Sequence, residues 1–462
     1  MISDPDVVGL LYLLAIICFV LALRFLSSPR TARRGNWLGG LGMAVAIGTT
    51  LLLDGISNWG LILAGGAVGT IVGVIGARRV KMTAMPQMVA LFNGVGGGAA
   101  ALVALAEFHV ADGRLASEEV VSIVLSALIG SISFAGSLIA FGKLQELLSG
   151  RPIVFAGQNV ANGVVLLGSA ALGVALVAGL EEQWALVALL ALALAFGVLF
   201  VLPIGGADMP VVISLLNAFT GLAASATGFV LDSTVLIASG MLVGASGTML
   251  TLLMAKAMNR SVANVLFGAF GQVQQAVGSE RVDDGRTVRA TTADDVAVQL
   301  SYARRVVVVP GYGLAVAQAQ HDVRQLAELL EQKGVEVAYA IHPVAGRMPG
   351  HMNVLLAEAN VPYDQLKEMD EVNPEFAQTD VALVIGANDV VNPAARNDPS
   401  SPIHGMPILE VDKATSVVVM KRSMATGFAG IDNELFLDPR TTMLFGNAKD
   451  SVVKLIGSVK AL

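Results

Sequence analysis

Long apolar stretches alternate with short polar connections over the first 260 residues of the chain. A helix needs about 20 mostly apolar residues to cross the hydrocarbon core of a bilayer. Windows of that length predict nine membrane-spanning helices, near residues 7–25, 37–53, 59–77, 86–106, 121–142, 160–180, 184–202, 208–230 and 234–256. Glycines at every fourth position of the third window, Gly65, Gly69 and Gly73, predict close packing of helix backbones.

The pattern changes near residue 260. Residues 259–303 mix glycine, glutamine, serine and charged residues without sustained periodicity, which predicts a flexible linker, and Thr292 followed by two aspartates predicts a helix start near its end. Short apolar runs then alternate with helical segments, which is typical of a parallel, doubly wound sheet. The predicted strands are Arg305–Pro310, Val335–Ile341, Asp380–Ile385 and Ser416–Met420.

These patterns predict a polytopic α-helical membrane bundle of about nine spans, fused to an α/β domain with a doubly wound parallel sheet. We expect a membrane domain over residues 1–260, a linker over 261–300 and a water-soluble domain over 301–462. Composition agrees, because 55% of the residues are hydrophobic, 14% are charged, and the mean hydropathy is +0.70. The acidic amino terminus lacks a basic leader and a small-residue cleavage site, so we expect the first helix to be retained.

Charge and cysteine content narrow the range of functions. The net charge of −7 argues against a nucleic-acid-binding protein. Cys18 is the single cysteine, which excludes a disulfide framework and a cysteine-rich metal site, and we predict no metal site.

Basic residues predict the orientation of the spans in the membrane. Eleven of them follow the odd-numbered windows, whereas only Arg114 lies in the other connections. The positive-inside rule therefore predicts an amino terminus outside and a carboxy-terminal domain in the cytoplasm. The eleven are Arg24, Arg30, Arg33, Arg34, Arg78, Arg79, Lys81, Lys143, Arg151, Lys256 and Arg260.

Few polar side chains are expected at membrane depth, and no Lys, Arg, His, Asp or Glu lies deep within a window. The candidates are Asn93, Asn217, Ser246 and Asp208, which stands where the eighth window begins. A buried amide needs a hydrogen-bond partner, so each Asn either joins two helices or lines a hydrated proton path. Asp208 either caps a helix or belongs to the same path.

A glycine turn follows the first predicted strand. Gly311, Tyr312 and Gly313 lead into Leu314, Ala315 and Val316, which open a helical stretch. Strand, glycine turn and helix match the dinucleotide-binding fingerprint of Rossmann-like domains, in which glycines let the pyrophosphate approach the backbone. Val316 replaces the third glycine of that fingerprint.

The residues at the strand ends favour NADP over NAD. The second strand ends at His342, where an NAD-selective domain usually has a carboxylate for the ribose hydroxyls. Lys421, Arg422 and Ser423 follow a later strand and suit a 2′-phosphate, because Arg binds phosphate as a fork and Lys as a point charge. The alternative is that both cations are solvated surface residues.

Two further loops contain glycine next to charged residues. Residues 344–351 include Arg347, which we expect to pair with the pyrophosphate, and residues 386–393 include Asp389. Asp389 either caps a helix, or its pKa responds to the redox state of the cofactor and gates a proton step.

Together these motifs resemble one family, the beta subunit of the proton-translocating NAD(P)+ transhydrogenase of the two-subunit bacterial type. The resemblance rests on Met85-Pro86, Gly205–Pro210, Pro310–Gln320, His342–Leu356, Gly386–Ala394 and Lys421–Ser423. It implies NADP(H) on this chain, NAD(H) on a partner alpha subunit that adds membrane helices, and a dimer of alpha/beta units in the bacterial inner membrane. It also implies that the cofactor contacts Gly311, Tyr312, Gly313, Ala315, Val316, Val344, Ala345, Gly346, Arg347, Met348, Pro349, Gly386, Ala387, Asn388, Asp389, Val390, Gly405, Met406, Lys421, Arg422, Ser423, Met424, Ala425, Thr426, Gly427, Phe428, Asn447 and Ala448.

The chain departs from the family pattern at two positions. Relatives often have Tyr where Phe428 stands, and some have a membrane His where Asn93 stands. The expected function is hydride transfer between NAD(H) and NADP(H) coupled to proton translocation. One alternative is an ion channel or carrier regulated by a cytosolic nucleotide-sensing domain. Another is a membrane-anchored dehydrogenase, which would need a catalytic base that the sequence does not offer.

Overall fold

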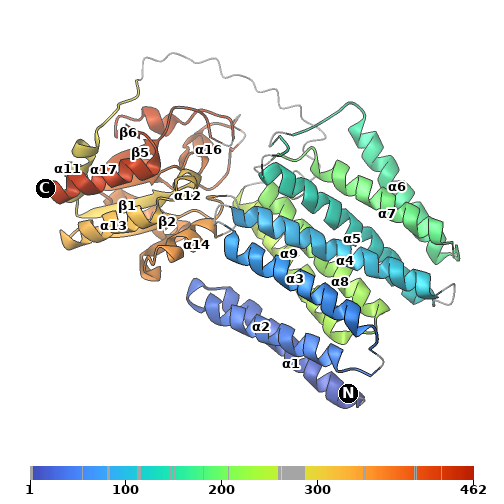
Figure 1. The fold of residues 1–462 in the computed structure, drawn as a ribbon. Helices are drawn as coiled ribbons and strands as arrows, with labels where there is room; N and C mark the ends of the chain where they lie inside the picture. Colours follow the sequence, from blue (N-terminus) through green and yellow to red (C-terminus); the bar gives the residue numbers. More distant parts are fainter. Residues whose placement is uncertain are drawn as a thin grey trace. The chain divides into compact units, whose positions relative to one another are not determined.

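A computed structural model describes most of the chain as two compact units, one of long helices and one built on a sheet (Figure 1). The described residues are 4–54, 56–80, 84–111, 116–145, 147–149, 152–180, 182–205, 208–258, 262, 287–346, 350–399, 401, 403–427 and 429–462.

Nine long helices form the first part of the described chain. They are α1 (Pro5–Leu26), α2 (Pro29–Leu51), α3 (Trp59–Arg79), α4 (Met85–Ala111), α5 (Ser117–Leu144), α6 (Gln158–Val177), α7 (Gln183–Val201), α8 (Met209–Val230) and α9 (Thr234–Ala257). Within the described residues, eight of these helices are long and apolar enough to cross a membrane, one fewer than the sequence predicted. The exception is α2.

The difference at α2 has a simple cause in the sequence. The helix begins at Pro29, a favourable first position, well before the predicted window at 37–53. Its first turns therefore contain Arg30, Arg33 and Arg34, which the sequence had suggested belong to a connection. These charges lower the apolar character of the helix, so its composition alone does not support a full span.

Helix α5 lies at the centre of this unit, against α4, α7 and α8. Backbones meet directly there: a Cβ atom on Gly130 would lie 2.5 Å from the carbonyl oxygen of Gly97, and one on Gly197 would lie 2.6 Å from that of Ile132. Glycine is required at such contacts, because packing replaces the hydrophobic effect inside lipid. Close packing was also predicted for α3. A Cβ atom on Gly65, Gly69 or Gly73 would meet no atom within 4 Å in the described part of this chain, so the packing of that face stays a prediction.

The second unit contains a six-stranded parallel sheet in the order β3-β2-β1-β4-β5-β6. The strands are β1 (Arg305–Pro310), β2 (Glu336–Ile341), β3 (Leu366–Glu368), β4 (Val381–Ile385), β5 (Ser416–Lys421) and β6 (Thr441–Phe445). The strand order reverses direction between β1 and β4, which are hydrogen-bonded neighbours. In open α/β sheets, a ligand crevice forms outside the carboxyl ends of the strands at this switch point.

Helices and turns connect the strands and cover the sheet. The α-helices are α11 (Ala293–Ser301), α12 (Tyr312–Ala317), α13 (Gln320–Gln332), α14 (His351–Glu358), α15 (Met369–Val372), α16 (Ala394–Asn397) and α17 (Ala448–Ala461). The short 3-10 helices are η3 (Tyr363–Gln365), η4 (Asn373–Gln378), η5 (Asp389–Val391), η6 (Val411–Lys413) and η7 (Glu434–Leu437). Helices α11, α12 and α13 all pack on α17. Fully buried valines of β1, β4 and β5 form the core together with Phe376.

The four strands predicted from the sequence are confirmed, and the predicted class of fold with them. Strands β3 and β6 were missed. β3 is three residues long and includes Lys367 and Glu368, and β6 begins directly after Pro439-Arg440, so neither shows a long apolar run.

The predicted linker, residues 261–300, lies mostly outside the described residues, but its last part has defined structure. Ala290 pairs with Met443 of β6, so residues 289–291 run beside the edge of the sheet. Thr292 then caps α11, because its side chain accepts a hydrogen bond from the backbone N–H of Asp295 at 3.2 Å, as the sequence predicted.

Candidate functional site

The loops after β1 and β4 touch through their backbones at the switch point. The N–H of Gly311 donates to the carbonyl of Ile385 at 2.9 Å, and that of Gly313 donates to the carbonyl of Gly386 at 3.0 Å. A Cβ atom on Gly311 would lie 2.3 Å from the nitrogen of Ala387, and one on Gly386 would lie 2.4 Å from the Cα of Gly313. Gly386 also has φ +67, which other residues rarely adopt. The base of the crevice therefore consists of backbone atoms without side chains. A pyrophosphate needs such a surface to approach the backbone closely.

Val316 does not disturb this arrangement, although it replaces the third glycine of the fingerprint. That glycine normally allows close packing between helix and strand. Val316 is 49% exposed, so its side chain points away from the sheet. Leu314 and Ala315 occupy the inner face of α12 instead, and both are buried.

The basic residues after β5 lie at the same end of the sheet. Partial burial lowers the pKa of Lys421, while the negative charges of Asp389 and Asp432 oppose that shift. The ammonium of Lys421 donates to the carbonyl of Ala425 and lies 4.8 Å from the centre of the Phe436 ring. Arg422 is exposed, and its guanidinium makes no hydrogen bond or ion pair with any described residue. The Oγ of Ser423 accepts a hydrogen bond from the Ala425 N–H at 3.4 Å.

The loops after β4 and β5 are joined through Asp389. One carboxylate oxygen of Asp389 accepts a hydrogen bond from the N–H of Ala429 at 2.9 Å. Gly427 lies so close that a Cβ atom on it would be 2.5 Å from the other carboxylate oxygen. The N-cap of η5 is Asn388, not Asp389, so the capping interpretation of Asp389 is wrong. Its carboxylate instead connects two loops that both belong to the candidate site.

His342 ends β2 and is almost completely buried. Its Nε2 lies 2.8 Å from the carbonyl oxygen of Pro407, which can only accept, so Nε2 carries the proton, while Nδ1 accepts from the N–H of Val344 at 3.2 Å. Burial lowers the pKa of this imidazole to about 4, so it is neutral at physiological pH. The side chain thus joins the loop after β2 to the segment that contains Gly405 and Met406.

We refer to the second unit, which contains the sheet, as the soluble unit. Its stability should depend on pH through His342. An unfolded histidine titrates near pH 6.5, so between that pH and about 4 the unfolded chain binds a proton that the folded chain does not. The free energy of unfolding is therefore complete above pH 6.5 and falls by about 3 kcal/mol as the pH is lowered to 4. Urea unfolding of residues 287–462 at a series of pH values measures this loss.

Two variants test the assignment to His342. His342→Gln should flatten the pH dependence in this window. His321→Gln, at an exposed histidine of the same unit, should leave it unchanged. Equal slopes in the wild type and in His342→Gln would contradict the assignment.

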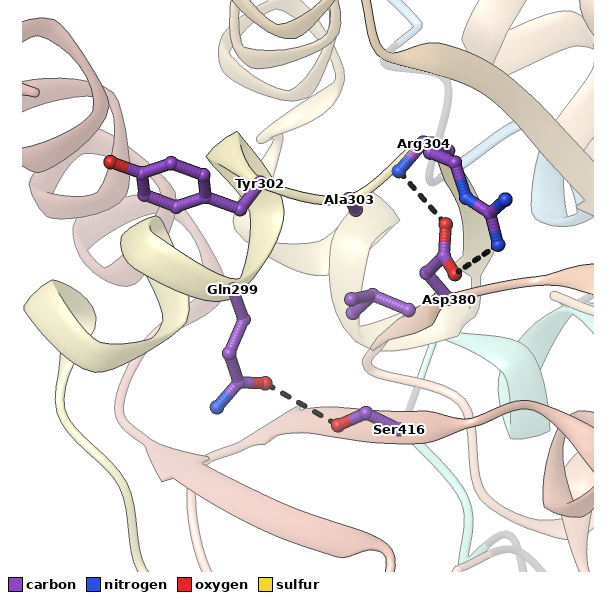
Figure 2. Close-up of a pocket in the computed structure, with 7 residues that line it drawn as sticks. Gln299, Tyr302, Ala303, Arg304, Asp380 and Ser416 are labelled. Carbon is purple, nitrogen blue, oxygen red and sulfur yellow. Dashed lines mark hydrogen bonds and ion pairs between the residues drawn. The ribbon is translucent and has the colours of Figure 1, made fainter.

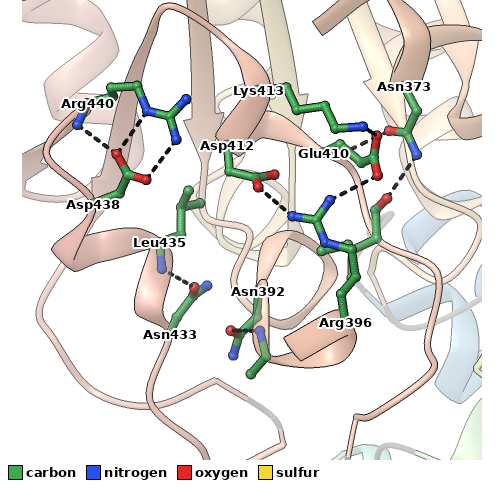
Figure 3. Close-up of polar contacts among 12 residues, drawn as sticks. Asn373, Asn392, Arg396, Glu410, Asp412, Lys413, Asn433, Leu435, Asp438 and Arg440 are labelled. Atoms are coloured by element: carbon green, nitrogen blue, oxygen red, sulfur yellow. Dashed lines mark hydrogen bonds and ion pairs between the residues drawn. The ribbon is translucent and has the colours of Figure 1, made fainter. Parts of the chain in front are cut away.

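Charged and amide side chains hold the segment around Gly405 in place (Figure 3). The guanidinium of Arg396 pairs with Glu410 at 2.9 Å and with Asp412. Asn373 donates to the carbonyl of Ile408 at 3.0 Å and accepts from the N–H of Glu410 at the same distance. Arg396 precedes the loop that carries Gly405 and Met406, and Ile408, Glu410 and Asp412 follow it, so these contacts hold the loop at both ends.

The described candidate residues thus gather at the carboxyl edge of the sheet. Most follow β1, β2, β4, β5 or β6 directly, and Gly405 and Met406 reach that edge through Pro407 and His342. Asn447 caps α17, since its side chain accepts a hydrogen bond from the Lys449 N–H at 3.0 Å. The predicted residues Arg347, Met348, Pro349 and Phe428 lie outside the described residues.

A pocket at the opposite, amino edge of the sheet contains none of the predicted residues (Figure 2). Asp380 lines this pocket. Its carboxylate accepts hydrogen bonds from the N–H groups of Arg305 at 3.0 Å and Arg304 at 2.8 Å, which lower the pKa of the carboxyl group. Gln299 accepts a hydrogen bond from the hydroxyl of Ser416 at 3.3 Å. These polar groups bind one another, so this pocket connects α11 to the strand ends.

A second polar site lies inside the helical unit, around Asn93. Its amide donates to the hydroxyls of Ser137 at 2.9 Å and Ser133 at 3.3 Å, both on α5. Ser133 also lies 2.6 Å from the hydroxyl of Thr220 and donates to the carbonyl of Leu216 at 2.9 Å. The Oδ1 of Asn93 is buried and has no hydrogen-bond partner among the described residues. We call Asn93, Ser133, Ser137 and Thr220 the polar cluster; it joins α4, α5 and α8.

The other predicted membrane residues stand apart from this cluster. Asp208 occupies the N-cap position of α8 without a capping bond from its side chain. Asn217 is half-buried and makes no side-chain hydrogen bond to a described residue, and Ser246 bonds only the carbonyl of Val243 at 3.3 Å. The hydroxyls of the cluster were missed because single Ser and Thr residues are ordinary in apolar helices. The four-residue spacing of Ser133 and Ser137 on the fifth window was the available signal.

The fold and its crevice define the class: a membrane protein that carries a dinucleotide-binding domain. A family model described as "NAD(P) transhydrogenase beta subunit" matches residues 8–458. The chain therefore belongs to the NAD(P) transhydrogenase beta subunit family.

Similar sequences agree with this assignment. Two relatives from Rhodospirillum rubrum, each named "NAD(P) transhydrogenase subunit beta" and one of them from a named strain, are 49% identical to this chain over 452 residues, which cover 96% of this chain and 97% of each relative. The family binds nicotinamide nucleotides, and the designation "beta subunit" implies a partner alpha subunit.

Proposed function

We propose that the soluble unit binds NADP(H) at the carboxyl edge of its sheet, and that the alpha subunit binds NAD(H). The observation that carries this proposal is the Lys421-Arg422-Ser423 sequence at the end of β5, combined with a buried, neutral His342 at the end of β2. A 2′-phosphate suits two cations and a hydroxyl, whereas ribose hydroxyls would need a carboxylate at the end of β2. The bare backbone at Gly311, Gly313 and Gly386 would accommodate the pyrophosphate.

The bound nicotinamide supplies the hydride chemistry, so this chain needs only to bind and orient it. A fixed loop arrangement serves that purpose. Asp389 connects the loops after β4 and β5, and His342 connects the loop after β2 to residue 407. Asp389 is also a candidate for gating, since its carboxylate lies at the junction that a change in the bound cofactor would alter.

The helical unit moves protons across the bilayer in this proposal. The polar cluster supports a path, because Asn93 keeps a buried oxygen without a partner among the described residues, which suits an ordered water. Asp208, Asn217 and Ser246 remain candidates for other parts of the path. Proton entry supplies about 2.3 kcal/mol per charge for each 100 mV, and it would act through different affinities for the oxidised and reduced cofactor.

The assembly follows from the same proposal. The alpha subunit would carry the NAD(H) domain and further membrane helices, and two alpha/beta units would form a dimer in the bacterial inner membrane. The excess of basic residues on one side of the spans supports a periplasmic amino terminus and a cytoplasmic soluble unit.

Calorimetric titration of the full-length chain with NADPH and, separately, with NADH tests the cofactor assignment. We expect NADPH to bind about 100-fold more tightly, because hydrogen bonds to a charged phosphate contribute about 1.5–3 kcal/mol each. Equal affinities would overturn the assignment.

Reconstitution with the alpha subunit in lipid vesicles tests the rest of the proposal. Hydride transfer from NADPH to an NAD+ analogue should then change the pH of the vesicle lumen, as a trapped dye reports. A nucleotide-regulated channel or carrier would instead conduct without turning over either cofactor.

A further inference from the structure

Lys143 is a buried cation that the proposed proton path does not use. It lies in the last turn of α5 and is only 3% exposed. Its ammonium donates to the carbonyl of Ile204 at 2.7 Å and to that of Leu202. The sequence indicated only a basic residue at the cytoplasmic end of a span, but the structure turns its side chain into the protein.

Carbonyl oxygens are the acceptors that stabilise a positive charge on Lys143. No carboxylate lies within ion-pair distance of it among the described residues. Its acceptors are carbonyl oxygens at and beyond the C-cap of α7, Leu202, where the helix dipole is negative. A buried ammonium without such acceptors would be very unfavourable, so the two carbonyls offset part of the cost of burying the charge.

The two acceptors belong to the turn that connects α7 to α8. The carbonyl of Leu202 also accepts from the N–H of Ile153 at 3.1 Å, and Ile204 is 2% exposed. The N–H of Asp208, the N-cap of α8, donates to the carbonyl of Gly205 at 3.1 Å, one residue beyond Ile204. Lys143 therefore fixes the turn from which α8 starts.

Helix α5 also contacts α8 at a second position along its length. Ser133 donates to the carbonyl of Leu216 and contacts Thr220 within the polar cluster. Ser133 and Lys143 are ten residues apart on α5, which is about 15 Å along the helix. Between them, Gly136 packs against Leu216 and Val201, so the end of α7, the turn and the first half of α8 are all held by α5.

We propose that Lys143 is a positioning residue for proton coupling: its side chain holds the α7–α8 turn, and thereby keeps α8 in register with the polar cluster. This inference rests on the proposed function, because it concerns protons moved per hydride transferred. Without the ammonium, the carbonyl of Ile204 loses its donor, that of Leu202 keeps only the N–H of Ile153, and the turn loosens. Hydride transfer would then continue while fewer protons accompany it.

The test uses the chain reconstituted with its alpha subunit in lipid vesicles, and it measures hydride transfer and lumen pH in the same sample. K143M should lower the number of protons moved per hydride about fivefold or more, because it removes both hydrogen bonds of the ammonium. K143R, which keeps a permanent charge and several donors, should stay within about twofold of the wild type. R24M removes an exposed cation near the end of α1 and serves as the matched control, with an unchanged ratio.

The ratio separates positioning from a merely structural role, because fewer folded complexes would lower hydride transfer and proton movement equally. A wild-type ratio in K143M overturns the inference. Loss of the ratio in an assembled K143R also overturns it, since the ammonium would then have to release its proton. If K143M does not assemble, K143Q takes its place with the same expected fall. A wild-type complex that moves no protons would sink the proposed function itself, which distinguishes the two failures.

Discussion

A fragment of residues 301–462 will be less stable than a fragment of residues 287–462 by about 3 kcal/mol. The shorter fragment begins at the boundary predicted from the sequence and lacks α11, whose Val296 and Leu300 are fully buried. Burying one such side chain contributes about 1.5–3 kcal/mol, and the entropy of ordering the segment offsets part of the sum. Urea unfolding followed by circular dichroism measures the difference.

Two substitutions within the longer fragment locate the effect. Leu300→Ala should cost about 3 kcal/mol, because it leaves a cavity under α11. Val298→Ala, on the same helix but 44% exposed, should cost less than about 0.5 kcal/mol. Equal midpoints for the two fragments would show that α11 does not stabilise the soluble unit.

Arg422→Ala will weaken the binding of NADPH to the full-length chain by about 10- to 100-fold and leave that of NADH within about threefold. An arginine hydrogen-bonded to a phosphate contributes about 1.5–3 kcal/mol, and only NADPH has the 2′-phosphate. Among Lys421, Arg422 and Ser423, Arg422 gives the sharper test, because its guanidinium makes no hydrogen bond or ion pair with a described residue, whereas Lys421 also donates to the carbonyl of Ala425. Calorimetric titration with each cofactor gives both affinities.

Lys333→Ala is the matched control, since this exposed lysine lies just before β2, at the amino edge of the sheet. It removes one positive charge far from the crevice and should leave both affinities unchanged. Equal losses for NADPH and NADH in Arg422→Ala would mean that the arginine binds a group common to both cofactors. The proposed preference would then need another source.

The sheet could be predicted from sequence where each strand is a continuous apolar run. β1 and β4 are buried on both faces, so valine and isoleucine fill them and the pattern is unambiguous. β3 and β6 depend on pairing with neighbouring strands, and Lys367 or Thr442 gives no local indication of it. The pairing of Ala290 with Met443 joins residues distant in sequence, which no local pattern predicts.

The candidate site was predictable for a similar reason. Glycine turns and basic residues at strand ends are local features, and parallel strands bring their carboxyl ends to one edge. The membrane cluster was predictable only at Asn93, because an amide is unusual in an apolar helix while a serine is not. The inward turn of Lys143 was hidden, since a lysine at the end of a span normally extends to the interface.

The two rims of the sheet, its outer strands β3 and β6, explain how such a domain avoids aggregation with further copies of itself. One rim is β3, only three residues long and containing Lys367 and Glu368, and the other is covered by residues 289–291 beside β6. A long bare strand would act as a template on which further copies could stack into fibrils. Neither rim offers one, so concentrated solutions of a piece that keeps residue 287 onward should stay clear, whereas trimming those residues should favour precipitation.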